Sequence, residues 1–437
     1  MNSLLLRFSQ SFASLGQRDF RYLTFSTAAL GFGQWFQQIG LGWLILEVTG
    51  SAAQIGGVAF IQGIMLLLAS FPAGVLADRY NRRDVLVWST AIGVFQALAL
   101  ALLVFSDQVQ VWHLYAFAFI GGLANGVSQP VRQAMVYDLT SRELLTNAMT
   151  VNSMAQSVAR VSGPPVAGML LGLFGTSSAF FVLSGLKLAA MALTMLIPTQ
   201  ALAQTSRRTE SPFASVASGL RYSVQNPLIR ALLIITSVGP ILVYPYIQFL
   251  PIFAKDVLHG GPEVYGLLAT GVGWGSLIGL SVLAIVGDVQ NKGKVYIISH
   301  IAYIGMVLAF AQSESLALAM VFLIGAGICN SLSNVLANTL FQLACTNEMR
   351  GRVMALHSMS GGLQPMGGLP MGFAIERWGA SNSVAAFMAF AMALVGVGSV
   401  IFPQLWRGVL PEEGAAGDAR PPRSGEAALE RPPRRSA

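Results

Sequence analysis

The chain carries little charge for its length. Only 10% of its 437 residues are Asp, Glu, Lys or Arg, whereas an ordinary soluble domain has about 25%. So few charges cannot cover the surface of a soluble protein of this size. A hydrophobic content of 54% is also too high for a disordered chain. The composition therefore excludes both classes and predicts a protein that folds within a lipid bilayer.

The sequence also lacks the motifs of disulfides, of ATP binding, of metal sites and of catalytic pairs. The two cysteines, Cys329 and Cys345, would lie about 24 Å apart on one predicted helix, which is too far for a disulfide. No G-x-x-x-x-G-K-[ST] loop occurs, so ATP has no phosphate-binding site through which to drive the protein directly. Neither a metal-ligand cluster nor a nucleophile–base pair stands out among the four histidines. We therefore expect no enzymatic activity, no metal and no cofactor.

The net charge of +7 would suit a nucleic-acid partner, but its distribution does not. The basic residues form short clusters between apolar runs, without the continuous basic face that follows a phosphate backbone. Membrane topology explains these clusters better. We expect a lipid bilayer and a small molecule as partners, no nucleic acid, and a monomeric chain.

Twelve apolar runs approach or exceed the roughly 20 residues that a membrane-spanning helix needs. They predict an all-α membrane protein with twelve transmembrane helices, at residues 20–46, 52–77, 85–106, 112–134, 147–173, 177–198, 229–253, 263–287, 295–312, 315–339, 352–376 and 380–403.

The lysines and arginines gather on one side of these predicted helices. All but four of the 26 fall in alternate connections or in the terminal segments on that side. Of the four exceptions, Lys255 and Arg377 lie on the other side, and Arg160 and Lys187 lie inside predicted helices. Because basic loops stay in the cytoplasm, the sequence predicts a multi-pass protein of the cell (inner) membrane with both termini cytoplasmic.

A polar stretch after the sixth predicted helix divides the chain, and its second part has the apolar spacing of a surface helix. The predicted organisation is an N-terminal cytoplasmic lead-in, a six-helix half, a cytoplasmic linker, a second six-helix half and a disordered cytoplasmic tail, at residues 1–19, 20–198, 199–228, 229–405 and 406–437.

The two halves also repeat weakly. A shift of 205 residues places Asn125 on Asn330, and a shift of 210 residues places Asn81 on Asn291. Matches at the same relative helix in both halves favour a parallel, pseudo-symmetric duplication.

The connection after the second predicted helix contains the motif GVLADRYNRR, from Gly74 to Arg83. It resembles the signature G-x-L-A-D-R-x-G-R-R of the major facilitator superfamily. Asn81 replaces the second glycine of that signature, and asparagine tolerates the left-handed backbone that a glycine there would serve. The resemblance extends over residues 18–405.

The resemblance implies a conformational gate on the cytoplasmic side. In this reading Asp78 meets the positive N-terminus of the eleventh helix, and Asp138 pairs with Arg82 or Arg83. The gating residues implied are Gly74, Asp78, Arg79, Arg82, Arg83 and Asp138.

Finer likeness points to the bacterial transmembrane-secretion-effector branch, which includes the enterobactin exporter. It is carried by QRDFR before the first helix, GLRY in the linker and RGRV at the start of the eleventh helix. The fifth helix contains Gly163, Pro164 and Gly168, similar to the helix-packing motif of antiporters in the superfamily, with Ala159 and Ala167 replacing two of its glycines. A Gly-Pro pair bends a helix and permits close packing.

Polar residues recur on helices that line the central cavity in this superfamily. The candidate cavity residues are Gln34, Gln38, Asn125, Asn152, Gln156, Arg160, Tyr244, Gln248, Asn330, Asn334 and His357. Some of them can instead serve as hydrogen-bonding glue between helices.

Two cations stand in the predicted membrane interior without a nearby acid. Arg160 costs at least about 2.5 kcal/mol there without a partner or water, and it either contacts the substrate or bonds helix carbonyls at the Pro164 bend. Lys187 is expected to snorkel or pack at the periphery rather than to contact a ligand. With no carboxylate in the interior, a neutral or anionic substrate is favoured over a cation.

The leading hypothesis is a secondary active exporter of a small amphipathic or anionic molecule, such as a siderophore-like metabolite or a drug. By resemblance it would work by alternating access, driven by an ion gradient, most simply of protons. The available proton carriers are Asp78, Asp138, His300 and His357.

Two alternatives remain at this stage. One is an importer with the same fold, which differs only in the direction of transport. The other is a polytopic receptor or lipid-modifying enzyme. A receptor would need a soluble signalling domain, and an enzyme would need catalytic residues at a membrane face; the sequence shows neither.

Overall fold

The computed structural model describes residues 13–199, 212–287 and 289–407, and every regular element within these ranges is helical. This confirms the all-α prediction. Most of the predicted lead-in, the first part of the linker and the tail from residue 408 onward lie outside the described residues.

The N-terminal half consists of six long helices whose positions agree with the first six predicted runs to within a few residues. Two short turns, η1 (Ala13–Gly16) and η2 (Arg142–Leu144), accompany them. The long helices are α2 (Arg18–Thr49), α3 (Ala52–Arg79), α4 (Arg82–Phe105), α5 (Val111–Asp138), α6 (Leu145–Phe174) and α7 (Thr176–Met195).

The C-terminal half begins after the linker helix α8 (Pro212–Gln225) and is less regular. It contains α9 (Pro227–Val238), η4 (Gly239–Val243), η5 (Tyr244–Phe249), α10 (Leu250–Ile252), η6 (Phe253–Val257), α11 (Pro262–Val286), α12 (Lys292–Ala311), α13 (Leu316–Ala344), α14 (Asn347–Gly361), α15 (Gln364–Trp378), α16 (Ala380–Ile401) and α17 (Gln404–Arg407).

The seventh and eleventh predicted runs do not form continuous α-helices. The segment from α9 to η6 passes through π and 3₁₀ turns, because Pro240, Pro245 and Pro251 each lack the backbone donor that an α-helix requires. The eleventh run is divided into α14 and α15 by a turn at Gly362 and Leu363. Each of these two runs is therefore helical but interrupted, and the segment Pro227–Val257 is still long and apolar enough to cross a membrane.

By length and composition, nine helical segments in the described part of the chain can cross a membrane. Two further helices, α2 and α5, match predicted runs and are long enough, but polar residues such as Gln34, Gln37 and Gln129 interrupt their apolar sequence. The remaining predicted run is the one divided between α14 and α15. A membrane protein with many spans is thus established, and the number twelve stays a prediction.

The helix ends follow local sequence signals. Ser51 caps α3 by accepting a hydrogen bond from the Gln54 amide at 3.2 Å, and Asn226 caps α9 ahead of a proline at the first helical position. Gly50 ends α2 with φ of +62°, a conformation that glycine adopts without strain.

Corresponding helices of the two halves pack in the same pairs. In the N-terminal half α3 packs along α5, and α4 packs along α7; in the C-terminal half α11 packs along α13, and α12 packs along α16. The pairing agrees with the internal repeat seen in the sequence.

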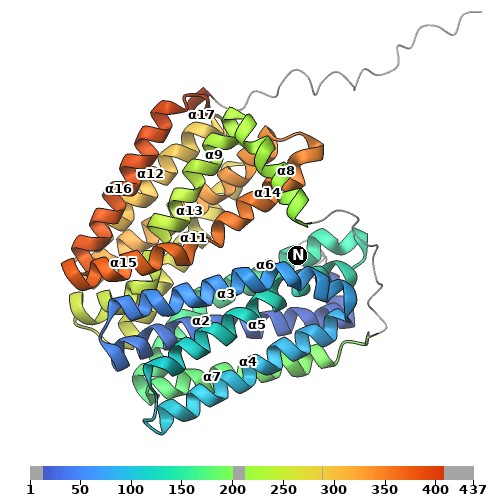
Figure 1. The fold of residues 1–437 in the computed structure, drawn as a ribbon, viewed down its shortest axis with the longest axis vertical. Coiled ribbons are helices and arrows are strands. Elements are labelled where there is room, and N and C mark those ends of the chain that lie inside the picture. The colour runs from blue at the N-terminus through green and yellow to red at the C-terminus, as the bar shows by residue number, and fades with distance from the viewer. Residues whose placement is uncertain (1–12, 200–211, 288, 408–437) are drawn as a thin grey trace, which may run out of the picture.

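The halves meet mainly through two helix pairs, α3 with α15 and α6 with α11 (Figure 1). A Cβ atom added to Gly168 on α6 would lie 2.5 Å from the Pro262 carbonyl oxygen and 2.9 Å from the Gly266 Cα on α11. Only glycine permits the two backbones to approach so closely.

All of these close approaches between the halves lie toward one end of the molecule, which we call the joined end. It contains the start of α3, the end of α6, the start of α11 and the end of α15. The opposite end carries the basic residues of the connections, among them Arg82, Lys292 and Arg350, and we call it the basic end. The halves diverge from the joined end toward the basic end (Figure 1).

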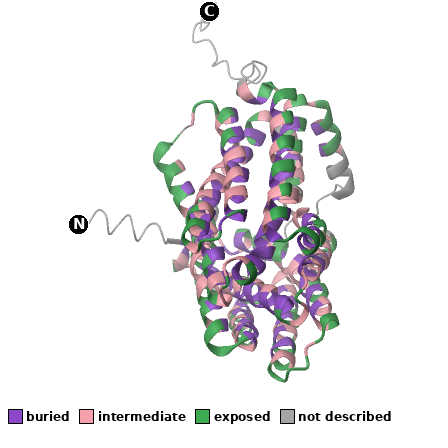
Figure 2. Ribbon diagram, turned by 90° about the vertical axis from the view of Figure 1, so that its left-hand side faces the viewer, coloured by how far each residue is buried: buried purple, intermediate pink, exposed green. Residues whose placement is uncertain are grey.

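The outer faces of the helices are exposed (Figure 2), and many of the exposed residues are large and apolar. On α4, for example, Trp88, Phe95 and Phe105 are each more than 70% exposed. Large exposed apolar surface of this kind on a soluble protein would aggregate, so it indicates contact with lipid.

Candidate functional site

A cavity of about 590 Å³ lies between the two halves. Most of its wall comes from α2, α3, α5 and α6, and η5 and α15 close it from the other half. No Asp or Glu is among the described residues that line it. The wall is therefore polar but not acidic.

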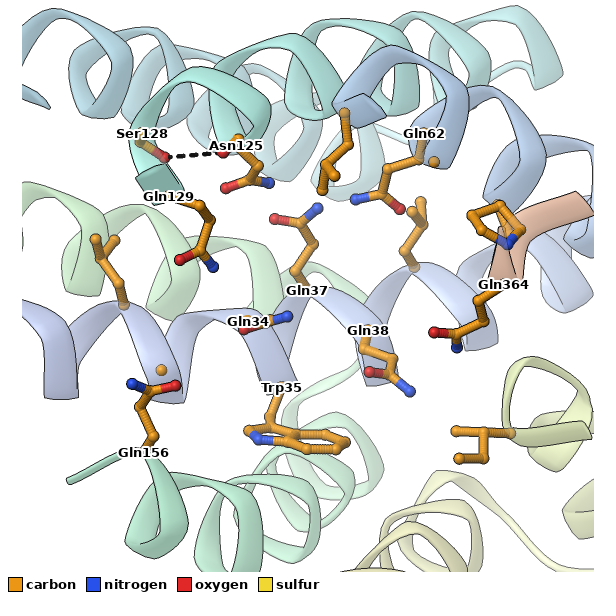
Figure 3. Close-up of a pocket in the computed structure, with 18 of the residues that line it drawn as sticks. Gln34, Trp35, Gln37, Gln38, Gln62, Asn125, Ser128, Gln129, Gln156 and Gln364 are labelled. Carbon is orange, nitrogen blue, oxygen red and sulfur yellow. Dashed lines mark hydrogen bonds between the residues drawn. The ribbon is translucent and has the colours of Figure 1, made fainter. Parts of the chain in front are cut away.

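Side-chain amides dominate the polar part of this wall. In Figure 3, Gln37 from α2 and Asn125 and Gln129 from α5 point toward one another, with Gln34 nearby on α2. Gln156 from α6 and Gln364 from α15 border the same space. Because an amide both donates and accepts hydrogen bonds, this wall can bind a ligand with many oxygen or nitrogen atoms.

A second cavity of about 490 Å³ adjoins the first and is formed mainly by the C-terminal half. Tyr244 and Gln364 line both cavities. Arg160 reaches the second cavity from α6 and its side chain is exposed. His300 lies in the wall, where its Nδ1 is 3.0 Å from the Ser333 hydroxyl.

Each of the eleven residues selected from the sequence lines one of these cavities. The first contains Gln34, Gln38, Asn125, Asn152, Gln156, Tyr244 and Gln248. The second contains Arg160, Asn330, Asn334 and His357, together with Tyr244. The structure therefore brings them into one continuous region between the halves.

Two cations in the first cavity were not selected from the sequence. Arg132 on α5 is only 7% exposed, and its NH1 group donates to the Ser26 hydroxyl at 3.2 Å, while NH2 has no hydrogen-bond partner. Ser26 lies on α2 and Arg132 on α5, so spacing along one helix does not predict this contact.

Lys187 was expected to snorkel or to pack at the periphery, and the structure shows a packed side chain that does not snorkel. The side chain is only 8% exposed, and its Nζ donates to the Gln37 Oε1 atom at 3.4 Å, at the wall of the first cavity. It does not snorkel to a membrane surface.

The motif loop between α3 and α4 is held by an ion pair within the N-terminal half. Arg82 NH1 lies 2.5 Å from Asp138 Oδ2, and both side chains are largely buried. Arg83 donates to the Met195 carbonyl at 2.5 Å and lies 3.4 Å from Asp84. Of the two partners considered for Asp138, the structure thus selects Arg82.

Of the remaining motif residues, those whose side chains the structure describes have no hydrogen bond or ion pair to the other half. Gly74 and Arg79 are exposed, and a Cβ atom at Gly74 would meet nothing within 4 Å. The side chain of Asp78 lies outside the described residues. Its pairing with the start of α14 therefore stays a prediction.

The backbone conformation expected at Asn81 occurs instead at its repeat partner. Asn81 is extended, with φ of −64°, and caps α4 by accepting a hydrogen bond from the Arg83 amide at 3.0 Å. Asn291, before α12, adopts the left-handed conformation with φ of +56°. Asn81 thus replaces a glycine by serving as a helix cap rather than through a left-handed turn.

The packing motif of the fifth predicted helix lies at two contacts. A Cβ atom added to Gly163 would lie within about 3 Å of the Trp35 side chain, next to the first cavity. The Pro164 carbonyl and Gly168 face Gly266 on α11, at the junction of the halves. The motif therefore connects the cavity wall with the joined end.

The part of the chain that the structure describes contains neither a candidate metal site nor a disulfide. No cluster of three His, Cys, Asp or Glu side chains that could hold a metal occurs there, and both cysteines are free.

The family model for transmembrane secretion effectors matches residues 9–410 of this chain. The chain belongs to the transmembrane secretion effector family. This confirms the resemblance to the major facilitator superfamily, and members of the family are multi-pass membrane transporters of small molecules rather than enzymes.

Curated relatives of this family member are transporters too. It is 24% identical to the staphyloferrin A transporter of Staphylococcus aureus (strain NCTC 8325 / PS 47) over 363 residues, which are 82% of this chain and 90% of the relative. It is 24% identical to the multidrug efflux pump Tap of Mycolicibacterium fortuitum over 395 residues, covering 88% and 95%.

Solved structures with the same fold include two transporters. The nucleoside transporter NupG superposes with a TM-score of 0.69 at 14% identity, covering 88% of this chain and 98% of that one. A bacterial homologue of the human lysosomal transporter Spinster, in an inward-facing and occupied conformation, gives 0.69 at 15% identity, covering 89% and 97%. These likenesses show the fold.

Proposed function

We propose that this family member is a secondary active exporter that moves a small molecule through the cavity between its halves by alternating access. The observation that carries the proposal is the polar cavity itself, enclosed by helices of both halves that touch at one end and diverge at the other. Two rigid halves that rock about such a cavity expose it to each side in turn. The efflux functions in the names of relatives favour export.

The basic end is assigned to the cytoplasm, because basic connections are retained there. On this assignment both termini are cytoplasmic, the protein lies in the inner membrane, and the cavity faces inward in the present conformation. Twelve spans follow if α2, α5 and the α14–α15 pair cross the bilayer together with the nine apolar segments. The protein acts as a monomer and without nucleic acid.

The substrate is neutral or anionic. No acid among the described residues lines either cavity, so a cation would find no opposite charge to replace the water it loses. Amides of the wall supply hydrogen bonds to a polar substrate, and Arg160 contributes a positive charge to the second cavity.

The driving force is an ion gradient, and the simplest choice is protons. The candidate carriers within the cavities are His300 and His357, both in the wall of the second cavity. Asp138 is engaged with Arg82, so it fits a structural role in the motif loop better than proton transfer.

The experiment compares cells that lack the protein with cells that produce it. Candidate siderophores and dyes of different charge are loaded, and their retention is followed with and without a protonophore. Faster loss of a neutral or anionic compound from producing cells, abolished by the protonophore, is expected. Faster uptake would make the protein an importer, and loss that continues without a gradient would contradict secondary active transport.

A further inference from the structure

Lys187 is the one lysine among the described residues that line the first cavity, and its side chain is only 8% exposed. It is carried by α7, a helix packed against α2 and α4 on the side away from the other half. From there its side chain extends to the cavity wall, where Nζ donates to Gln37. A lysine placed for solubility would extend toward water or lipid headgroups instead.

The space for this side chain is provided by a glycine on the neighbouring helix. A Cβ atom added to Gly93 on α4 would lie 3.1 Å from the Lys187 Nζ and 3.2 Å from its Cδ. One turn before Lys187, the Ser184 hydroxyl donates to the Val94 carbonyl at 3.3 Å, which holds α7 close to α4. Gly93 therefore lets the lysine pass along α4 toward the cavity.

Among the described residues, no acidic group balances the charge of Lys187. Its one hydrogen bond among the described residues is the 3.4 Å contact with a neutral amide, although an ammonium group can donate three. No carboxylate is within ion-pair distance of it in the described part of the chain. A buried cation of this kind is costly unless an anion approaches it.

We propose that Lys187, oriented by Gln37, binds an oxyanion group of the transported molecule at the wall of the first cavity. Carboxylate, phosphate and sulfonate groups share the required chemistry of exposed negative oxygen atoms. Neighbouring amides such as Gln34 and Gln129 supply further donors to the same group (Figure 3). The proposal rests on the proposed function and adds a substrate class and a specificity-determining residue.

Trp35 provides a readout that does not require the natural substrate. It lines the same cavity, so its fluorescence reports which small ions enter. The purified full-length protein is titrated at neutral pH with iodide, with caesium and with neutral acrylamide, all at constant ionic strength. The fluorescence of Trp35 is obtained as the difference between the unmodified protein and the Trp35→Phe variant. Because a buried positive charge concentrates anions, iodide should quench this signal much more strongly than caesium.

Lys187→Gln should lower the iodide quenching of Trp35 severalfold and leave acrylamide quenching unchanged, which shows that the cavity is intact. Lys187→Arg should retain iodide quenching, because the charge is kept. Lys255→Gln is the matched control, since it removes the same charge from an exposed site outside the cavity. Gly93→Ala, which crowds the lysine, should lower iodide quenching partly. Citrate should suppress iodide quenching in the unmodified protein.

Equal iodide quenching in the unmodified protein and in Lys187→Gln, or no effect of citrate, would overturn the proposal. Its failure is distinguishable from failure of the proposed function, because quenching requires no transport. Active export with unchanged quenching would reject only the role of Lys187. If quenching depends on Lys187 but no gradient-driven transport occurs, the proposed export function is rejected and the anion-binding site at Lys187 remains.

Discussion

The carboxylate of Glu376, near the end of α15, accepts hydrogen bonds from the Ser51 hydroxyl and the Ala53 amide at the start of α3. A negative charge at a helix N-terminus is favourable, and this contact joins the two halves at the joined end. The sequence predicts the converse arrangement at the basic end, where Asp78 at the end of α3 would meet the start of α14.

Removing these two charges should therefore shift the conformational equilibrium in opposite directions. Glu376→Gln should weaken closure of the joined end and populate the outward-facing state by about twofold to fivefold, since such contacts are worth about 0.3–1 kcal/mol. Asp78→Asn should favour the inward-facing state and lower transport. Distances between spin labels on the two halves measure both shifts. Shifts of the same sign would contradict the paired roles.

The close glycine contact between α6 and α11 implies that a larger side chain there hinders closure of the joined end. Gly168→Ala places a methyl group against the Pro262 carbonyl and Gly266, and overpacking of this kind costs about 1–3 kcal/mol. The joined end should close less often, and transport should fall roughly tenfold or more. The control is Gly185→Ala on α7, where a Cβ atom meets nothing within 4 Å. Equal transport by both variants would show that the close approach is unnecessary.

The hydrogen bonds of Ser26 imply that replacing this residue lowers the stability of the protein. Its hydroxyl accepts from Arg132 and lies 3.0 Å from both the Ala190 carbonyl and the Thr194 hydroxyl, which ties α2 to α5 and α7. Ser26→Ala removes an acceptor from a buried guanidinium and should cost about 1–3 kcal/mol. Thermal unfolding of the purified protein checks this, with the exposed Ser281→Ala as control. Equal unfolding temperatures would mean that Arg132 finds another partner.

The charge of Arg160 in the second cavity implies that transport selects for anionic compounds. Arg160→Gln should weaken export of an anion far more than export of a neutral compound. Arg160→Lys should rescue only partly, because a guanidinium binds an oxyanion through two parallel hydrogen bonds and an ammonium does not. Initial export rates of an anionic and a neutral dye measure this. Equal losses for both dyes would assign Arg160 a structural role, and strong export of cationic dyes by the unmodified protein would contradict an anionic substrate.

The helices and most of the cavity could be predicted because both leave periodic signals. Long apolar runs predict the spans, and polar residues such as Gln34 and Gln38, four positions apart, mark one face of a helix. The breaks in the seventh span leave no such clear signal: Pro240 and Pro245 accompany its π and 3₁₀ turns, whereas Pro130 lies inside the continuous helix α5.

Lys187 and Arg132 could not be placed in this way. The direction of the Lys187 side chain depends on Gly93, which lies on another helix and only becomes its neighbour in the fold. The burial of Arg132 likewise depends on Ser26. Spacing along one helix carries no information about such contacts, so the two cations of the first cavity emerged only from the three-dimensional arrangement.

In the proposed mechanism the first cavity is open to the cytoplasm and is exposed to the other side during transport. Gln34→Cys, in a chain whose free Cys329 and Cys345 are replaced by serine, tests it with a membrane-impermeant maleimide. Inside-out vesicles should label rapidly, and right-side-out vesicles should label only when a gradient and a transported compound allow turnover. Labelling from the outside alone, or none from the cytoplasmic side while Lys294→Cys reacts, would contradict an inward-open cavity that alternates between the two sides.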